Sequence, residues 1–308
     1  MNDGVIGFPR GADAPSGLLG FPLGLADLGP TRFATYNQTP AQTFFNGVDA
    51  PAGANTKPTA WTVVCAAAEF DGDGIYLNFN SSGTQSSALF DFAWGPTDTS
   101  LTLLVENLCV CGNGGAGGGT NGHPTGMTFI PGRIPAGARI VARAQCATGS
   151  QGFRIAVTLV GGGFYRMITQ YLSEGTCTYV GVLTAGSEGT SIDPGGVAGS
   201  KGSWIEIGRA EKRIKAMIVS VNQENTAPST AYFRLDVSKN SGREIILPDY
   251  ALGASAGTTN TGEGVLGNTL THLLFADVHA GETLAARLQS SITDATDRLL
   301  QVSVVGFA

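Results

Sequence analysis

The three histidines are the first residues to consider as catalytic groups or metal ligands, because imidazole serves both roles near neutral pH. They are His123, His272 and His279, and none stands at a metal-ligand spacing from another histidine or from a cysteine pair. His279 also takes the place that Pro135 holds in a similar segment earlier in the chain, which suits a turn residue. The histidines therefore favour neither a metal centre nor a general base.

Cysteine thiolates are the next candidates for metal ligands or nucleophiles. The chain has five cysteines, at 65, 109, 111, 146 and 177, an odd number without the spacing of a disulfide framework. We interpret them as reduced and mostly buried side chains of a protein that folds in a cytoplasm. Cys109 and Cys111 would share one face of a strand, like half a zinc site, but no second pair completes four ligands. We expect no metal and no cofactor.

Two glycine-rich segments and one acidic segment resemble ligand-binding loops. "GNGGAG" at 112–117 fits G-x-G-x-x-G, but no helix follows to receive a phosphate, and "GGVAGSKGS" at 195–203 lacks the spacing of a phosphate loop. "EFDGDG" at 69–74 could offer Asp71 and Asp73 to Ca²⁺, yet further oxygen ligands and a closing glutamate are missing. An Asp-Gly turn is the favoured interpretation of that segment.

An internal repeat is the strongest signal in the chain. "IPAGARIVARAQ" at 134–145 returns as "VHAGETLAARLQ" at 278–289, with five of twelve positions identical. Trp61 in "AWTVVCAA" matches Trp204 in "SWIEIGRA". Three further pairs of blocks follow in the same order, with offsets between 142 and 145: 74–80 with 216–222, 88–94 with 231–237, and 155–161 with 300–306. Such spacing indicates that a whole domain has been duplicated, with an offset of about 143 residues.

Apolar residues alternate within these blocks, as half-buried strands require. The expected inward residues and their matches are Ile75, Leu77 and Phe79 with Met217, Val219 and Val221; Phe90, Phe92 and Trp94 with Phe233, Leu235 and Val237; and Ile155, Val157 and Leu159 with Leu300, Val302 and Val304. The opening repeat adds Ile140, Ala142 and Ala144 with Leu284, Ala286 and Leu288, and it turns Arg143 and Gln145 outward.

One segment also fits a helix. "ETLAARLQSS" places Leu284, Leu288 and Ile292 on a helical stripe. We favour a strand, because the first copy, with its Pro, Gly and β-branched residues, is a poor helix and duplicated units should share one fold.

The expected fold class is all-β, with two tandem, duplicated β-sandwich (jelly-roll-like) domains and an extended N-terminal arm. The 45 glycines and 14 prolines favour turns, and each unit offers roughly seven or eight short strands. The expected boundaries are an arm over 1–44, a first sandwich over 45–171 and a second over 172–308.

The N-terminal arm is apolar but has no helical or strand periodicity. It contains "GFP" twice, at 7–9 and 20–22, and either of two interpretations fits it: a disordered terminus, or an arm that binds grooves on neighbouring subunits. The residues expected to dock are Phe8, Leu18, Leu19, Phe21, Leu23 and Leu25. We expect no secretion signal and no membrane insertion, since Gly, Pro and Asp interrupt the apolar run.

Charge and aromatic content bear on the partners. Only 14% of the residues are charged, which indicates that other chains cover part of the surface. The net charge of −6 without a basic cluster argues against nucleic acid. Trp61 and Trp204 are expected as core anchors at strand starts, while Tyr36, Phe44, Phe45 or Tyr250 could stack on a sugar.

These features together resemble a class of proteins. The phrase "IPAGARIVARAQ" before an alternating strand, the low charge, the tandem sandwiches and the arm are similar to structural virion proteins of tailed bacteriophages, of the decoration, fibre or tail-attachment type. The resemblance implies a non-enzymatic protein that forms symmetric homo-oligomers and attaches to capsid or tail proteins through its arm. It also implies location in the virion, after assembly in the host cytoplasm.

Two other functions stay open. One is a receptor-binding tail fibre or adhesin module, which would recognise a host surface glycan through the loops at 111–126 and 253–268. The other is a hydrolase with a jelly-roll fold, which needs a carboxylate pair or metal cluster that the sequence does not assemble.

Overall fold

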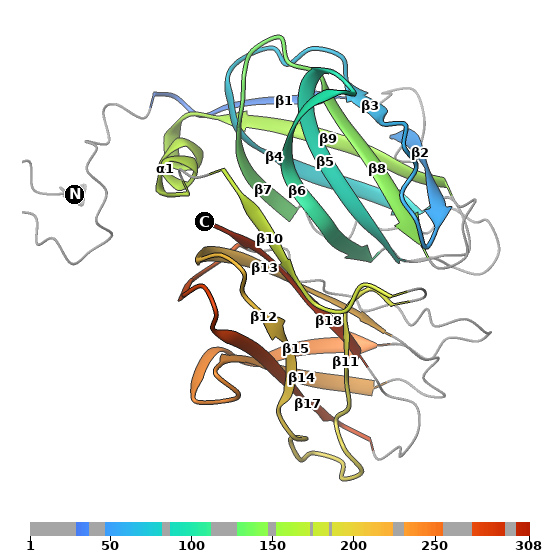
Figure 1. Ribbon diagram of the computed structural model, residues 1–308, viewed down its shortest axis with the longest axis vertical. Helices are drawn as coiled ribbons and strands as arrows, with labels where there is room; N and C mark the ends of the chain where they lie inside the picture. The colour runs from blue at the N-terminus through green and yellow to red at the C-terminus, as the bar shows by residue number, and fades with distance from the viewer. Residues whose placement is uncertain are drawn as a thin grey trace, which may run out of the picture.

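The described residues fold mostly into β-strands, as expected for the all-β class (Figure 1). The computed structural model describes residues 29–36, 47–81, 87–111, 128–146, 152–172, 175–184, 187–223, 231–254, 273–292 and 300–308. Within these ranges the helical element is α1 (Gly163–Tyr171), and no described helix is long and apolar enough to cross a bilayer.

The first half of the chain forms nine strands that pair in one continuous sheet. They are β1 (Arg32–Tyr36), β2 (Val48–Ala54), β3 (Thr62–Cys65), β4 (Gly72–Ser81), β5 (Ser87–Thr97), β6 (Ser100–Cys111), β7 (Thr128–Ile134), β8 (Ile140–Cys146) and β9 (Gly152–Gly161). The order is β6-β5-β8-β2-β9-β4-β7, with β1 also on β9 and β3 also on β8. Strand β2 joins two layers, since it pairs antiparallel with β9 and parallel with β8.

The second half forms two separate sheets. Its strands are β10 (Cys177–Val180), β11 (Thr190–Ile192), β12 (Ile205–Arg209), β13 (Ile214–Gln223), β14 (Ala231–Lys239), β15 (Glu244–Ala254), β16 (Leu274–Val278), β17 (Thr283–Ser290) and β18 (Leu300–Phe307). One sheet has the order β10-β18-β13-β16 with β11 also on β18, and the other has the order β12-β17-β14-β15.

The two halves share one order of strand pairing. Strand β9 pairs with β1, β2 and β4, and β4 continues to β7; strand β18 pairs with β10, β11 and β13, and β13 continues to β16. In the first half, β8 also pairs with β3 and β5, and β5 pairs with β6. In the second half, β17 pairs with β12 and β14, and β14 pairs with β15. Each described strand of one half therefore has a counterpart in the other.

The Ala-Gly pair in the opening repeat forms the same turn in both halves. Gly137 has φ +78° and donates its amide to the Ala68 carbonyl at 2.7 Å; Gly281 has φ +87° and donates to the Ala210 carbonyl at 2.8 Å. Glycine adopts this left-handed conformation without the cost that a Cβ adds. The repeated glycine is thus a requirement of the turn that precedes β8 and β17.

The strands after these turns bury the residues expected to point inward. Ile140, Ala142 and Ala144 are buried in the first half, and Leu284, Ala286 and Leu288 are buried in the second. The segment 283–290 is a strand, which confirms the interpretation favoured over a helix. Arg143 and Gln145 lie on the opposite, partly exposed face.

The expected alignment of the halves is wrong by two residues in two blocks. Asp91 lies opposite Arg143 and Asp236 lies opposite Arg287, so β5 and β14 are offset by 236 − 91 = 145 residues. The matched inward residues are thus Phe90 with Leu235 and Phe92 with Val237; in β9 and β18 they are Ile155 with Val302 and Val157 with Val304. A slip of two residues keeps the same face apolar, so alternation could not detect it. Trp94, expected inward, is only half-buried.

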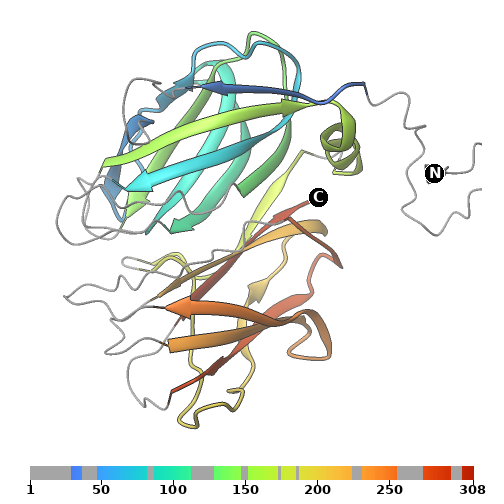
Figure 2. The same cartoon turned by 180° about the vertical axis from the view of Figure 1, so that it is seen from behind.

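The halves pack directly against each other. All eight residues of β18 are buried, because one face of the strand lies in the second core and the other faces the first half. Val305 and Phe307 of β18, with Ala216 and Ile218 of β13, belong to the hydrophobic cluster of the first half. Figure 2 shows the two layered bodies stacked end to end, with β18 and β13 between them.

The region expected to be an arm contains a strand, and the junction between the halves holds a helix. Residues 32–36 form β1, which pairs with β9, so the strand-forming body begins inside the range 1–44. The junction holds helix α1, which begins at Gly163, two residues after β9 ends at Gly161, and its Ile168 and Thr169 are buried. The expected docking residues Phe8, Leu18, Leu19, Phe21, Leu23 and Leu25 lie outside the described residues.

Candidate functional site

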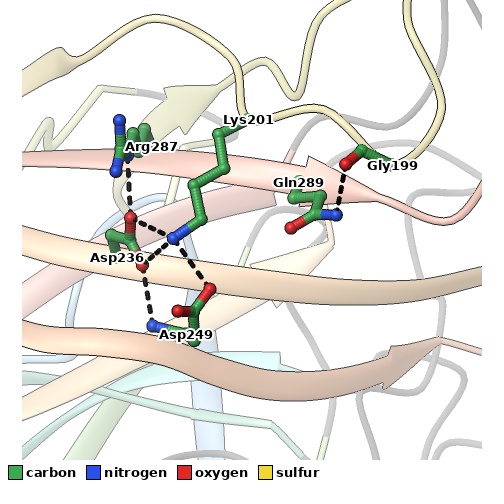
Figure 3. Close-up of polar contacts among 6 residues, drawn as sticks. All are labelled: Gly199, Lys201, Asp236, Asp249, Arg287 and Gln289. Atoms are coloured by element: carbon green, nitrogen blue, oxygen red, sulfur yellow. Dashed lines mark hydrogen bonds and ion pairs between the residues drawn. The ribbon is translucent and has the colours of Figure 1, made fainter.

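A buried carboxylate lies at the centre of the outer face of the β12-β17-β14-β15 sheet. Asp236 on β14 has a side chain that is 0% exposed, and three groups satisfy it (Figure 3). Lys201 Nζ lies 2.9 and 2.7 Å from the two carboxylate oxygens, and Arg287 Nε lies 2.7 Å from Oδ2. The backbone N–H of Asp249 donates to Oδ1 at 2.7 Å. We call Lys201, Asp236, Asp249 and Arg287 the second-half charge cluster.

Hydrogen bonds set the charge state of this cluster. Burial alone raises the pKa of Asp236, but the hydrogen bonds from Lys201, the Asp249 amide and Arg287 outweigh it, so that pKa lies below its ordinary value. Desolvation lowers the pKa of Lys201, but its hydrogen bonds to Asp236 and Asp249 raise that pKa above the ordinary value. Both groups are therefore ionised at neutral pH, and neither is poised to exchange a proton.

An aromatic ring covers the cluster from one side. The guanidinium carbon of Arg287 lies 4.5 Å from the centre of the Trp204 ring, within the range of a cation–π interaction. Gly242, with φ +94°, lies against the same ring, and a Cβ there would be 2.4 Å from the indole Nε1. Trp204 is half-buried at the start of β12, so it lies on the outer face instead of in the expected core.

The first half carries the same arrangement. Asp91 is 0% exposed and accepts hydrogen bonds from Lys57, from Arg143 Nε at 2.8 Å and from the backbone N–H of Asn107 at 3.0 Å. Lys57 also donates to the Asn107 side-chain oxygen. The Arg143 guanidinium lies 4.4 Å from the centre of the Trp61 ring, so Trp61 too is a half-buried outer-face residue. Lys57, Asp91, Asn107 and Arg143 form the first-half charge cluster.

The two clusters differ in net charge. The first holds two cations and one carboxylate, a formal charge of +1, whereas the second holds Asp249 where the first has Asn107 and is neutral. Asn107 and Asp249 both have positive φ, at 55° and 46°. Asn and Asp tolerate this conformation better than other side chains, which explains their presence there. The clusters tie three strands and a loop together in each half.

A groove opens on the second-half sheet beyond the charge cluster. It has a volume of about 680 Å³, and its lining includes Gly199, Tyr232, Arg234, Ala251, Gln289 and Ser291. Arg234 and Tyr232 lie two and four residues before Asp236 on β14, on the same outer face. Gln289 donates from Nε2 to the Gly199 carbonyl at 2.5 Å, which fixes one wall (Figure 3).

The corresponding place in the first half is closed. In the first half, Leu89 lies opposite Cys109 and Gln145 on its neighbouring strands. In the second half, Arg234 lies opposite Ala251 and Gln289 in the same way. Leu89 is therefore the counterpart of Arg234. Leu89 is 0% exposed and Cys109 is 1% exposed, and they form a small cluster of their own. Cys109 Sγ lies 3.8 Å from a Glu188 carboxylate oxygen of the second half. The first-half face is thus an internal contact surface, while its second-half counterpart is open.

The remaining residues considered for chemistry have structural contacts. The Asp71 carboxylate accepts the Ala136 amide at 2.8 Å, and the Asp73 carboxylate accepts the Gly162 amide at 2.7 Å. His279 donates its backbone amide to Glu282 at 2.7 Å within a turn. Among the described residues, no three His, Cys, Asp or Glu side chains come together as a metal site. His123, His272 and the segment 112–117 lie outside the described ranges.

Four of the five cysteines can be placed. Cys65, Cys109 and Cys146 are buried, Cys177 is half-buried, and none of these four forms a disulfide. Burial raises the pKa of the Cys65 and Cys177 thiols, which disfavours the reactive thiolate form. The side chain of Cys111 lies outside the described set.

The aromatic residues proposed to stack on sugars are engaged elsewhere or not described. The Tyr36 hydroxyl accepts the Glu69 amide at 2.8 Å, and Tyr250 packs against the second core. Phe44 and Phe45 lie outside the described residues, as does most of the loops at 111–126 and 253–268. The exposed groove residue Tyr232 was not among the candidates.

The charge clusters were missed by the sequence analysis, although the sequence carries a signal for them. Lys57 and Lys201 are 144 residues apart, and Asp91 and Asp236 are 145 apart, close to the offset of the repeat. Repeated charged residues inside apolar strands mark buried ion pairs, because a lone buried charge is unfavourable. The alignment in the sequence analysis was shifted by two residues and matched Asp91 with Arg234, so the repeated aspartate was not recognised.

Comparisons with known proteins add no identity. No family model and no curated protein matches the chain. Among solved structures it is similar to PNGF-II (9% identity, TM-score 0.33, 90% of this chain and 65% of that one) and to PNGase F, a glycosylasparaginase from Flavobacterium meningosepticum (9%, 0.32, 91% and 96%). It is also similar to a CBM22 tandem domain of Xyn10C from Paenibacillus barcinonensis (11%, 0.22, 91% and 92%). At these TM-scores the likenesses carry no argument.

Proposed function

We propose that the protein is a non-enzymatic structural component of a bacteriophage virion. In this proposal it assembles in the host cytoplasm with copies of itself and with other virion proteins, and it attaches to the capsid or tail through its N-terminal arm. The observation that carries the proposal is an aromatic surface around helix α1. Phe33, Phe164, Tyr171 and Phe275 are between 42% and 58% exposed there. Clustered exposed aromatic side chains mark interaction sites.

The aromatic surface is built from three parts of the chain. Phe33 of β1 and Phe164 of α1 both contact Tyr165, with ring centres 5.9 and 6.4 Å away. At the other end of the helix, Tyr171 contacts Phe275 of β16 with ring centres 6.0 Å apart. The surface therefore spans both halves, which gives a partner a site that only the complete body offers.

The place where the arm joins the body supports the proposal. Gly163, at the start of α1, donates its amide to the Gly29 carbonyl at 3.1 Å, and β1 begins at Arg32. The chain before residue 29 thus joins the body beside the aromatic surface (Figure 1). An arm that docks on a neighbouring copy would leave from the same side that offers exposed rings.

The shared strand order and the paired charge clusters support a finer statement about the fold. We propose that the halves are duplicated β-sandwich domains of the jelly-roll type. Each keeps a buried Asp with Lys and Arg partners and an Arg–Trp contact at the same place. Such clusters stiffen a scaffold and offer no reactive group, which fits a protein that acts through its surface.

Sedimentation of the full chain tests the assembly function. Phe164→Ser with Phe275→Ser should shift the protein from oligomer towards monomer, because the change removes apolar contact area. Val197→Ser is the matched control, since Val197 is 65% exposed away from this surface. A wild-type chain that stays monomeric at high concentration and does not enter particles would contradict the proposal.

A second candidate function is recognition of a surface glycan. The groove beside Tyr232 favours it, because an exposed aromatic ring next to polar side chains suits the apolar and hydroxyl faces of a sugar. A glycan-binding screen with the full chain tests this function, and the absence of any bound glycan would contradict it.

A further inference from the structure

We propose that the groove beside Tyr232 binds an acidic saccharide, with Tyr232 stacking on a pyranose ring and Arg234 binding the sugar carboxylate. This inference rests on the second candidate function and names its site and its ligand class. The site lies on the outer face of the β12-β17-β14-β15 sheet, and its described lining comes from β14, β15 and β17 and from Gly199 and Ser291.

Tyr232 provides the stacking surface. Its side chain is 69% exposed, the largest exposure among the large apolar and aromatic side chains that the structure describes. Its backbone is held on both sides, because its amide donates to the Ser291 hydroxyl at 3.0 Å and its carbonyl accepts the Ser291 amide at 2.9 Å. A rigid, exposed tyrosine ring loses little conformational freedom when a ligand covers it.

Arg234 provides an available positive charge. It lies two residues from Tyr232 on the same face, and it makes no ion pair with any described residue. The nearby cations Lys201 and Arg287 are already neutralised by Asp236 and Asp249. A guanidinium fork matches a carboxylate in two parallel hydrogen bonds, so Arg234 selects for an acidic ligand.

Small residues leave room for the ligand between these side chains. Ala251 lies opposite Arg234 and Gly253 lies opposite Tyr232 on β15, so the neighbouring strand carries no bulky side chain there. On the other side, Gln289 lies opposite Arg234 and offers an amide oxygen, since its Nε2 is bonded to Gly199. The ring, the guanidinium and the amide therefore border one shallow trough suited to a chain of sugar rings.

The closed counterpart in the first half strengthens the inference. In the first half, Leu89 takes the place of Arg234 and Cys109 takes the place of Ala251. Both are apolar and covered by the second half. The second half has Arg234 and Ala251 at these positions, and this face is open to solvent. If another protein covered it as the second half covers Leu89 and Cys109, the charge of Arg234 would be buried without a partner. The face is therefore better suited to a polar ligand.

Titration calorimetry of the full chain tests the inference with two matched pairs of probes. Sialyllactose is compared with lactose, and oligogalacturonate is compared with its methyl ester, so each pair differs in the carboxylate. We expect the acidic member of at least one pair to bind at least about tenfold more tightly than the neutral member. The pair that binds tells a sialic acid from a uronic acid.

Three variants locate the site. Tyr232→Ala and Arg234→Ala should each weaken binding by about tenfold or more, and Ala251→Phe should block the trough without removing either group. Arg133→Ala is the matched control, since Arg133 is an exposed arginine of the first half and should leave the affinity unchanged. All four positions have exposed side chains, so the variants should fold.

The outcomes separate the inference from the function. Binding that does not distinguish acidic from neutral probes, or that survives Tyr232→Ala and Arg234→Ala, overturns the inference while glycan recognition stands. A full screen without any glycan bound overturns both. Oligomerisation that is lost in Arg234→Ala, with no glycan bound, assigns the groove to protein contact and also overturns the inference.

Discussion

Arg287 lies over the Trp204 ring and, through the same guanidinium, donates a hydrogen bond to the buried carboxylate of Asp236. One cation therefore connects an outer-face aromatic ring to a charge inside the sheet. Arg143 does the same between Trp61 and Asp91 in the first half. The repeated arrangement makes each interaction measurable against its counterpart.

A double-mutant cycle on Trp204 and Arg287 should show that the two side chains are coupled. We expect a coupling energy of about 0.5–1 kcal/mol from Trp204→Leu and Arg287→Met, because the guanidinium is partly shielded from water. Chemical denaturation of the four proteins measures it. A cycle on Trp204 and the distant Arg133 should give a value near zero, and equal values in both cycles would refute the contact.

Removing the buried charge should destabilise the second half. Asp236→Asn should lower the free energy of unfolding by about 2–4 kcal/mol, because Lys201 and Arg287 lose their shared partner. Asp277→Asn is the control, since Asp277 pairs with Arg213 on the surface and should cost about 1 kcal/mol or less. If Asp236→Asn and Asp277→Asn lowered the free energy of unfolding equally, the buried ion pairs of Asp236 would be no stronger than the surface pair of Asp277, against the prediction.

Two glycines with positive φ should respond differently to alanine. Gly281→Ala should cost about 1–2 kcal/mol, because only the backbone conformation opposes it and no atom lies within 4 Å of the new Cβ. Gly242→Ala should cost more, because its Cβ would also meet the Trp204 ring. Thermal denaturation of both variants compares them, and Trp204→Leu should reduce the penalty at Gly242 only.

The lowered pKa of Asp236 predicts a loss of stability in acid. A carboxyl whose folded pKa is below its unfolded value of about 3.9 stabilises the fold above that pH, and the contribution disappears as the pH falls through the folded pKa. The stability difference between wild type and Asp236→Asn should therefore shrink below about pH 4. Asp277 and Glu282 also have lowered pKa values, but they titrate in both proteins and cancel in the difference. A difference that is constant from neutral to acid pH would contradict the prediction.

The strands and the Ala-Gly turns could be predicted because their signals are local. Alternation identified the inward residues of β8 and β17, and the repeat identified the Ala-Gly turn before each. The exact register could not be predicted, because a slip of two residues leaves the apolar pattern unchanged. That slip is why Asp91 and Asp236 were not matched.

The positions of Trp61 and Trp204 show a second limit. Tryptophan is usually interpreted as a core residue, but here an arginine from another strand covers each ring on the outer face. Helix α1 was missed because glycines surround it and its buried residues are few. The groove was missed because it depends on Tyr232, Ala251 and Gln289, which three different strands bring together.

The central place of β9 in the first-half sheet bears on how the protein reaches its native state. Arg32 of β1 pairs with Gly161 of β9, and Val48 of β2 pairs with Ile155 of β9. Strands β1 and β2 therefore pair with residues more than a hundred positions later in the chain. Closing such long loops lowers the conformational entropy of the chain before stabilising contacts form, and this makes folding slow. Until β9 is synthesised, β1, β2 and β4 expose unpaired edges, and a growing chain is then most vulnerable to aggregation.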